Sequence, residues 1–294
     1  MEALLTRIVE RVLLCDGAMG TALQQRGLKT GECPELWNVE RSNEVAAIHR
    51  DYIQAGAEAV ITNTFGGSPM KLDKFGLADQ VYKLNRAAAE LARDQACDDV
   101  YVFGDVGPTG EFLQPLGLLA PDDLVEAFAS QIQGLVDGGV DAIIVETMSA
   151  IDEAQCGIKA AKAVAPQLPV IASMTYEGGQ RGYRTVMGSD VRACAEALID
   201  TGADVVGTNC GTDIDGIIEV VGEYRSVTDA PLIVEPNAGV PELVDGRTVF
   251  KYTPEQMAER VPELVEKGAN IVGGCCGTTP DHIHVMAEAL AKLC

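Results

Sequence analysis

The sequence predicts an α/β fold in which residues 1–294 form a single (β/α)8 TIM barrel domain. Three observations support this prediction: a length of 294 residues, a short phrase that recurs four times, and eight apolar segments that are each followed by an amphipathic one. A barrel of this kind usually takes about 250 residues. An open, doubly wound sheet shows the same alternation of strands and helices and is the alternative.

The recurring phrase consists of a glycine, an apolar residue, a polar residue and two apolar residues. Its four copies begin at Gly56, Gly139, Gly202 and Gly268, each directly after an amphipathic segment. A glycine at this place is typical of a helix end, because glycine readily adopts a positive φ. The apolar run behind it is typical of a strand that is buried on both faces. Helix, glycine and buried strand in repetition indicate βα units with parallel strands.

The elements follow from this pattern in order along the chain. Strands are expected near residues 12–15, 59–63, 100–105, 142–146, 170–174, 205–209, 232–235 and 271–274. Helices are expected near residues 43–55, 78–96, 121–138, 152–165, 189–201, 213–226, 254–267 and 280–293. Four of these helices end just before the four glycines. Three begin at Pro121, Pro254 and Pro280, and the first turn of a helix accepts proline.

The charge excludes several classes of ligand. There are 44 acidic and 22 basic residues, which gives a net charge of −22. Nucleic acids and anionic membrane surfaces are both bound through clustered Lys and Arg, so neither is expected as a partner. The first residues do not form a secretory signal, and no window reaches the roughly 20 apolar residues that span a bilayer. We therefore expect a soluble, cytoplasmic protein, in which nine cysteines do not indicate a disulfide framework.

Polar and reactive side chains gather at the expected carboxyl ends of the strands, where a barrel builds its active site. They are Asp16, Asn63, Asp105, Glu146, Ser173, Asn209 with Cys210, Glu235 with Asn237, and Cys275 with Cys276. Polar residues in such turns also cap helices in many proteins. Helix capping does not account for two adjacent cysteines in a glycine-flanked turn.

Three of the nine cysteines are candidate metal ligands. Cys210 follows the sixth expected strand, and Cys275 and Cys276 follow the eighth, so all three face the same end of a barrel. The neighbouring glycines at 273, 274 and 277 permit the irregular backbone that lets adjacent side chains reach one point. Three sulfur ligands with one open position are typical of a catalytic zinc site. The other six cysteines are expected to be buried or incidental thiols: Cys15, Cys33, Cys97, Cys156, Cys194 and Cys294.

From about residue 12 to residue 284 the sequence resembles the homocysteine S-methyltransferase family. The segments that carry the resemblance are 16–21 (DGAMGT), 62–65 (TNTF), 209–210 (NC), 236–239 (PNAG) and 273–280 (GGCCGTTP). The first and last of them are most similar to the homocysteine-binding modules of cobalamin-dependent methionine synthases. The resemblance implies that Cys210, Cys275 and Cys276 bind Zn²⁺ and that the homocysteine sulfur enters the open position. It also implies that Asn237 holds this position when substrate is absent, although Asn237 is also a reasonable turn residue.

This chemistry requires a thiolate, because a free thiol is mostly protonated at neutral pH. Coordination to zinc deprotonates a thiol, so the metal would activate the nucleophile. Glu146 is the expected partner of the substrate ammonium, with a structural hydrogen bond as its alternative role. The backbone N–H groups of the turn at Gly17, Ala18 and Met19 suit the substrate carboxylate. The remaining predicted substrate-site residues are Asp16, Asn63 and Ser173, of which Asp16 and Asn63 are expected to order the site.

The predicted function is therefore zinc-dependent methylation of homocysteine to methionine. The expected donor is methylcobalamin or another methylcorrinoid, carried on a separate protein or module. S-methylmethionine, S-adenosylmethionine and a betaine are alternative donors. An aromatic cage for a quaternary ammonium donor is not evident at 5% aromatic content, although Phe65, Tyr176 and Tyr183 are available. Two further alternatives are a non-catalytic thiol- or zinc-binding module and a barrel enzyme for a phosphate ligand, which the lack of basic residues in the glycine turns disfavours.

Overall fold

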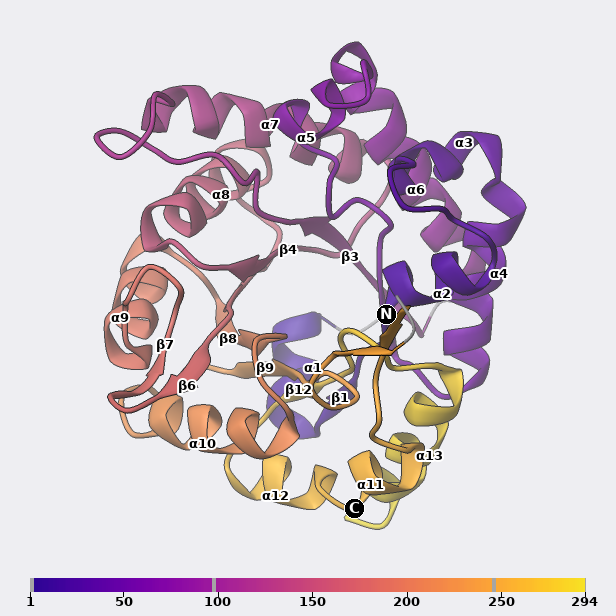
Figure 1. The fold of residues 1–294 in the computed structure, drawn as a ribbon, viewed down its shortest axis with the longest axis vertical. Helices are drawn as coiled ribbons and strands as arrows, with labels where there is room; N and C mark the ends of the chain where they lie inside the picture. The colour runs from indigo at the N-terminus through magenta and orange to yellow at the C-terminus, as the bar shows by residue number, and fades with distance from the viewer. Residues whose placement is uncertain (1–2, 97–98, 245–246, 294) are drawn as a thin grey trace.

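Eight parallel strands form the barrel in the computed structural model, which describes residues 3–96, 99–244 and 247–293 (Figure 1). The strands are β1 (Leu13–Leu14), β2 (Ala59–Ile61), β3 (Tyr101–Val106), β4 (Ala142–Met148), β5 (Val170–Met174), β8 (Val205–Asn209), β9 (Leu232–Glu235) and β12 (Ile271–Val272). Their order in the sheet is β1-β12-β9-β8-β5-β4-β3-β2, so neighbours in the chain are neighbours in the sheet. A parallel bridge between Cys15 and Ala59 joins the β1 and β2 edges. This order confirms the barrel and excludes the doubly wound alternative.

The helices surround the strands (Figure 1). Those that correspond to predicted helices are α4 (Ser42–Gln54), α6 (Val81–Gln95), α7 (Pro121–Asp137), α8 (Ile151–Val164), α9 (Val191–Thr201), α10 (Ile214–Arg225) and α13 (Pro280–Ala291). The helix expected over 78–96 starts as the 3-10 turn η2 (Ala78–Gln80) and continues as α6. Short elements that the pattern does not predict are α1 (Leu4–Glu10), α2 (Met19–Gln25), η1 (Pro34–Leu36), α3 (Trp37–Glu40), α5 (Pro69–Asp73) and the hairpins β6 (Glu177–Gly179) with β7 (Gly182–Arg184) and β10 (Glu242–Val244) with β11 (Arg247–Val249). No described helix is both long and apolar enough to cross a membrane.

The expected single helix over 254–267 is wrong. The structure has two helices here, α11 (Pro254–Ala258) and α12 (Val261–Glu266). Pro262 causes the interruption, because proline lacks the N–H for a helical hydrogen bond and its ring clashes with the carbonyl four residues earlier. The chain therefore starts a new helix in which Pro262 stands in the first turn.

The four recurring glycines adopt the conformation that the sequence predicts. Gly56, Gly139, Gly202 and Gly268 have φ angles of +111°, +92°, +109° and +102°. Each connects a helix to the strand that follows, and the left-handed conformation there favours glycine over any residue with a Cβ.

Apolar side chains fill the inside of the barrel and the layer between strands and helices. The inner cluster consists of Leu4, Ile8, Leu13, Cys15, Ala59, Tyr101, Phe103, Ala142, Ile144, Ile171, Val205, Ile233 and Ile271. Two of its members, Leu4 and Ile8, belong to α1, so this helix packs against the barrel interior. A larger cluster joins the outer faces of the strands to the surrounding helices.

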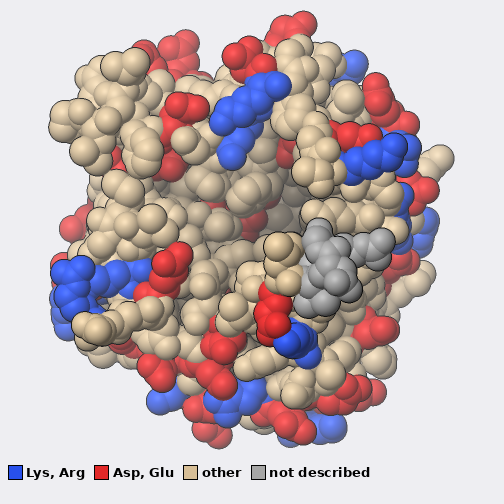
Figure 2. All heavy atoms as spheres, viewed as in Figure 1, with Lys and Arg blue, Asp and Glu red and all other residues tan. Residues whose placement is uncertain are grey.

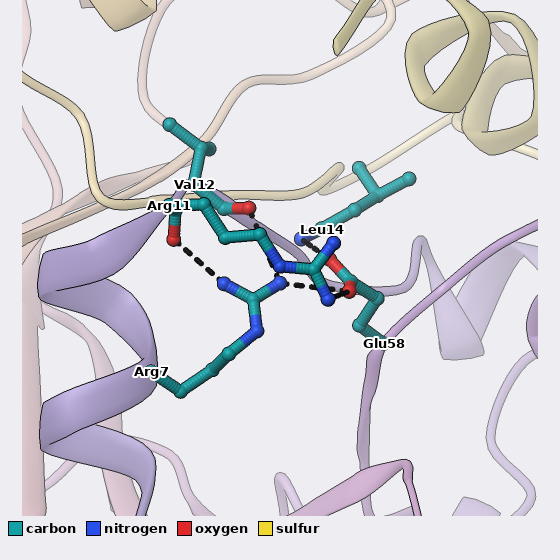
Figure 3. Close-up of polar contacts among 5 residues, drawn as sticks. All are labelled: Arg7, Arg11, Val12, Leu14 and Glu58. Carbon is teal, nitrogen blue, oxygen red and sulfur yellow. Dashed lines mark hydrogen bonds and ion pairs between the residues drawn. The ribbon is translucent and has the colours of Figure 1, made fainter. Parts of the chain in front are cut away.

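A partly buried ion pair fixes α1 at the amino ends of the strands (Figure 3). Arg7 Nη2 lies 2.7 Å from Oε1 of Glu58, which directly precedes β2, and Arg7 Nη1 donates to the carbonyl of Arg11 at 2.7 Å. Arg11 Nη2 lies 2.9 Å from the same Glu58 oxygen. The other Glu58 oxygen accepts from the Leu14 N–H in β1 at 3.3 Å. Helix α1 therefore closes the end of the barrel opposite to the strand ends that carry the reactive side chains.

Candidate active site

A cavity of about 480 Å³ lies at the carboxyl ends of the strands, where Figure 2 shows this face of the molecule hollowed at its centre. Segments that follow most of the barrel strands contribute to its lining. The lining residues are Gly17, Ala18, Met19, Gly20, Thr21, Pro34, Glu35, Ile61, Thr62, Asn63, Thr64, Phe65, Gly66, Lys71, Phe75, Asp105, Glu146, Thr147, Cys210, Glu235, Gly274, Cys275 and Cys276. The three candidate metal ligands and one predicted substrate carboxylate, Glu146, thus share one cavity.

The three cysteines converge as the sequence predicts. Cys210 Sγ lies 2.7 Å from Cys275 Sγ and 3.6 Å from Cys276 Sγ. All three sulfur atoms lie within 4.8 Å of one another. Cys276 is exposed, whereas Cys210 and Cys275 are partly buried, so the cluster is open to the cavity on one side. Within the described residues, this is the one group of cysteine, histidine and acidic side chains with the geometry to hold a metal ion.

An irregular backbone produces this convergence. Cys210 directly follows β8 and has a φ of +56°, which is rare for a residue with a side chain; its sulfur lines the cavity. Cys275 N donates to the carbonyl of Pro236 at 2.8 Å, and the Cys276 carbonyl accepts from Ala238 N at 2.9 Å. A Cβ on Gly274 would approach Thr278 Oγ1 to 2.6 Å, so this glycine permits the turn that presents both cysteines.

The electrostatics of the cluster fit a cation. Hydrogen bonds from Cys210 and Cys275 lower the pKa of Cys276 to about 3. Hydrogen bonds with the other two sulfur atoms and burial raise the pKa of Cys275 well above its ordinary value. The hydrogen bond with Cys275 lowers the pKa of Cys210, but the one with Cys276 and burial outweigh it and raise that pKa. One thiolate is therefore stabilised by its neighbours, and the full set of three requires a positive charge.

The distances also fit a tetrahedral metal, with one adjustment. Two sulfur atoms that are both about 2.3 Å from one zinc in tetrahedral directions lie roughly 3.8 Å apart. The 3.6 Å separation of Cys210 and Cys276 matches this value, whereas the 2.7 Å pair must separate by roughly 1 Å. Asn237, which is buried, has its Oδ1 3.3 Å from Cys210 Sγ and is the nearest candidate for a fourth ligand.

The other cysteines lie away from this cluster. Cys15, Cys33, Cys156 and Cys194 are buried free thiols, as the sequence predicts. Cys97 and Cys294 lie outside the described residues.

Glu146 is connected to the cysteine cluster through Asn209. Asn209 Nδ2 donates to Glu146 Oε2 at 3.1 Å and lies 3.8 Å from Cys275 Sγ. Burial and repulsion by the Cys276 thiolate raise the pKa of Glu146 to about 7. Ser173, a predicted substrate residue, does not line the cavity. Its hydroxyl instead donates to Asn209 Oδ1 at 2.6 Å. Ser173 therefore positions Asn209, which in turn bonds to Glu146.

Two acidic residues that the sequence placed at strand ends, but to which it assigned no role, also line the cavity. Asp105 is the penultimate residue of β3 and Glu235 is the last residue of β9, and each residue is 2% exposed. Burial, followed by repulsion from neighbouring carboxylates, raises the pKa of both well above the ordinary range. The signal that could have found them is the one that selected Glu146, a single carboxylate at the end of an apolar strand.

The remaining predicted residues fall into two groups. Gly17, Ala18, Met19 and Asn63 line the cavity. The Ala18 N–H is already bonded to Thr278 Oγ1 at 3.0 Å, and Asn63 Nδ2 donates to the carbonyl of Pro34 and to Asn38 at 2.9 Å each. Asp16 is buried outside the lining and accepts a hydrogen bond from the Ile61 N–H at 3.0 Å. Asp16 therefore orders the strand end, and the substrate contacts of the others stay predictions.

Comparison with known proteins agrees with this site. Residues 13–290 match the family model for homocysteine S-methyltransferase. The chain is 33% identical over 307 residues to a methionine synthase of Mycobacterium leprae, covering 98% of this chain and 25% of that protein. A methionine synthase of Mycobacterium tuberculosis is 33% identical over 308 residues, which cover 99% of this chain and 25% of that protein. The chain thus spans about a quarter of the length of these curated relatives.

Solved structures show the same fold. The metallated form of the homocysteine methyltransferase MmuM from Escherichia coli superposes with a TM-score of 0.78 at 24% identity, over 94% of this chain and 96% of that one. The carboxyl transferase domain of Rhizobium etli pyruvate carboxylase superposes with a TM-score of 0.55 at 16% identity, over 96% of this chain and 48% of that one.

Proposed function

The chain belongs to the homocysteine S-methyltransferase family, and we propose that it is a zinc-dependent enzyme that methylates homocysteine to methionine. The observation that carries this proposal is the convergence of Cys210, Cys275 and Cys276 at the open side of the cavity that also contains Glu146. A zinc ion held by these three thiolates would supply the positive charge that keeps an incoming thiol deprotonated at neutral pH.

The chain's own residues hold the acceptor. Glu146 is the proposed partner of the homocysteine ammonium, and Asn209 keeps its carboxylate in place. Asn237 occupies the side of Cys210 at which the substrate sulfur would arrive, and we propose that its amide yields that position to the thiol. The turn from Gly17 to Met19 borders the same cavity and is the proposed contact for the substrate carboxylate.

The proposed donor is methylcobalamin or another methylcorrinoid on a separate protein or module, which fits a cytoplasmic enzyme. Support comes from the two curated relatives, which are methionine synthases about four times as long as this chain. A betaine is a weaker candidate, because the described cavity lining has Phe65 and Phe75 as its aromatic residues. Tyr176 is buried and hydrogen-bonded to Tyr224 at 2.7 Å, so it is not free to form a cage.

The test is methyl transfer to homocysteine from free methylcobalamin, S-methylmethionine, S-adenosylmethionine and glycine betaine, each with and without a zinc chelator. We expect methionine from methylcobalamin and its loss with the chelator. Transfer from another donor alone would replace the corrinoid in this proposal. Tight binding of homocysteine without transfer from any donor would favour a non-catalytic thiol-binding module.

A further inference from the structure

The segment from Asn63 to Gly67 follows β2 and forms neither helix nor strand. Four of its five residues line the cavity, and one of them, Phe65, is 41% exposed. The proposed contacts to the metal and to the acceptor do not use Phe65. An aromatic ring that lines a cavity and still faces solvent is a candidate contact for a ligand.

Buried side chains from four separate elements, η1, α3, α6 and α7, bond to the backbone of this segment. The bonds are Asn38 Nδ2 to the Asn63 carbonyl at 2.9 Å, Gln131 Nε2 to the Thr64 carbonyl at 2.9 Å, Asn85 Nδ2 to the Gly67 carbonyl at 2.9 Å and the Gly66 N–H to Glu35 Oε1 at 2.7 Å. The four residues that supply these side chains are at most 3% exposed. Water can satisfy the backbone of an irregular segment. Bonds to buried side chains instead fix the segment in one conformation.

Two of these side chains hold the segment at a cost in stability. Asn85 Oδ1 and Gln131 Oε1 are buried and have no hydrogen-bond partner among the described residues. A buried acceptor without a partner is unfavourable, and such exceptions require an explanation. Proteins tolerate local costs of this kind where function requires a fixed geometry.

Close packing on both sides fixes the place of the Phe65 ring. A Cβ on Gly67 would lie 2.3 Å from Asn85 Oδ1, so only glycine lets the segment approach this amide. A Cβ on Gly107, which follows β3, would lie 2.6 Å from Cδ2 of Phe65. The ring therefore lies against the Gly107 backbone, and its exposed part borders the cavity.

The place of Phe65 in the barrel indicates which substrate it meets. Strand β2 lies opposite β8, since three strands separate the two on either side. The proposed acceptor lies on the β8 side, where Asn209 contacts both Glu146 and Cys275. Phe65 stands across the mouth from these groups. A donor that arrives from solvent and spans the mouth would cover the ring.

We infer that Phe65 is the residue of this site that contacts the methyl donor, and that the four buried side chains act as positioning residues for it. This inference rests on the proposed function, because it assumes that a donor reaches the cysteine cluster. A fixed apolar ring across the mouth from the cluster suits a donor that is broad and apolar on the side that meets the barrel. The planar macrocycle of a methylcorrinoid has this shape.

Substitution of Phe65 separates the donor from the acceptor. Phe65→Ala should raise KM for methylcobalamin about tenfold or more, because it removes the apolar contact, and should leave KM for homocysteine unchanged. Phe65→Leu keeps an apolar side chain and should raise KM for methylcobalamin less than about threefold. Equilibrium dialysis with methylcobalamin should show the same order of Kd values without turnover. Phe112→Ala is the control, since Phe112 is exposed on the loop after β3 and does not line the cavity.

Gln131 tests the positioning role. Gln131→Met keeps the length of the side chain but removes its bonds to the carbonyls of Thr64 and Asp105. If Gln131 acts through Phe65, this substitution raises KM for methylcobalamin in the wild type and has no further effect in Phe65→Ala. A merely structural role would change KM in both backgrounds alike. Gln133→Met is the matched control on the same helix, because the Gln133 amide bonds to exposed Asp137.

Unchanged KM and Kd for methylcobalamin in Phe65→Ala would overturn the inference, whether or not Gln131→Met folds. An equal rise in KM for homocysteine would overturn it as well, and so would a wild type that does not bind methylcobalamin. Failure of the proposed function is a different result. The wild type then transfers no methyl group to homocysteine from any donor, while dialysis still compares its Kd for methylcobalamin with that of Phe65→Ala.

Discussion

Asn209 Nδ2 donates a hydrogen bond of 3.1 Å to Oε2 of Glu146, which links the candidate substrate carboxylate to the last residue of β8, directly before Cys210. The same amide nitrogen lies 3.8 Å from Cys275 Sγ, and its Oδ1 accepts from the Thr147 N–H at 3.0 Å. Asn209 is fully buried. A single side chain therefore positions both the group proposed to hold the amine and the group proposed to hold the metal.

Replacing Asn209 should weaken substrate binding. Asn209→Ala removes the donor to Glu146 and leaves buried acceptors unpaired, at a cost of about 1–3 kcal/mol. We expect KM for homocysteine to rise about tenfold or more, measured by steady-state kinetics at constant metal content. Ser173→Ala is the matched comparison, because it removes the 2.6 Å bond to Asn209 Oδ1 and a longer bond of 3.4 Å from the Thr147 N–H, and leaves the Asn209 bond to Glu146 in place. Equal effects of the two variants would contradict a positioning role for Asn209.

Metal content should depend on three cysteines and not on the others. Cys210→Ser, Cys275→Ser and Cys276→Ser should each lose stoichiometric zinc, as measured by elemental analysis of reduced protein, because the cluster then has two thiolates. Cys194→Ser changes a buried thiol outside the cavity and should retain the metal. Stoichiometric zinc in Cys276→Ser would show that the metal is held elsewhere.

Acid should destabilise the fold through His49. Burial lowers the pKa of His49 from 6.5 to about 4, and neither ring nitrogen has a partner among the described residues. Between pH 4 and pH 6.5 the unfolded chain binds a proton that the folded chain excludes, so stability rises with pH through this window. The neutral state of His49 accounts for about 3 kcal/mol of the free energy of unfolding. This stability is fully present above pH 6.5 and is lost as the pH falls to 4.

Chemical denaturation at several pH values measures this effect. The difference in unfolding free energy between the wild type and His49→Leu should change by about 3 kcal/mol between pH 7 and pH 4, with the wild type relatively less stable at low pH. His284→Leu, at an exposed helical position, is the control. If the unfolding free energies of the wild type and His49→Leu changed in parallel with pH, His49 would be protonated in the folded protein as it is in the unfolded chain.

The two arginines that contact Glu58 should differ in their effect on stability. The Arg7 side chain is 8% exposed and that of Arg11 is 60% exposed. Arg7→Ala removes the less exposed partner of Glu58, which keeps Arg11, and should cost about 1.5–3 kcal/mol, whereas Arg11→Ala should cost less than about 1 kcal/mol. Urea denaturation measures both. Similar losses of unfolding free energy in the two variants would mean that burial of Arg7 does not strengthen its ion pair with Glu58.

The barrel was predictable because its signals are local and repeated. A glycine after each of four helices, with an apolar run behind it, indicates strands that are buried on both faces, and eight such units in one chain favour a barrel over an open sheet. The break at Pro262 was predictable from the proline itself. Helix α1 was not, because seven residues of mixed charge become a helix only by packing Leu4 and Ile8 against the barrel interior.

The residues of the candidate site also divide into those that the sequence predicts and those that only the folded structure reveals. The cysteine cluster follows from residue type and strand number alone, since strand ends meet at one face of a barrel. The contacts of Asp105 and Asn209 depend on which side chains of neighbouring strands lie within hydrogen-bond distance. A single sequence does not contain that information. Ser173 and Asp16 illustrate the converse, because both stand at strand ends and both use their polar atoms inside the protein.

Helix α1 has a consequence for the order of events in turnover. It packs against the barrel interior at the amino ends of the strands, and the lining residues of the cavity lie at the opposite, carboxyl ends. Cys276 is exposed on this same face, whereas Glu146 lies deeper in the cavity. If the proposed acceptor is held by Glu146, acceptor and donor would enter through a single opening, and we expect the acceptor to bind before the donor. Initial-rate kinetics with both substrates varied would then fit an ordered mechanism.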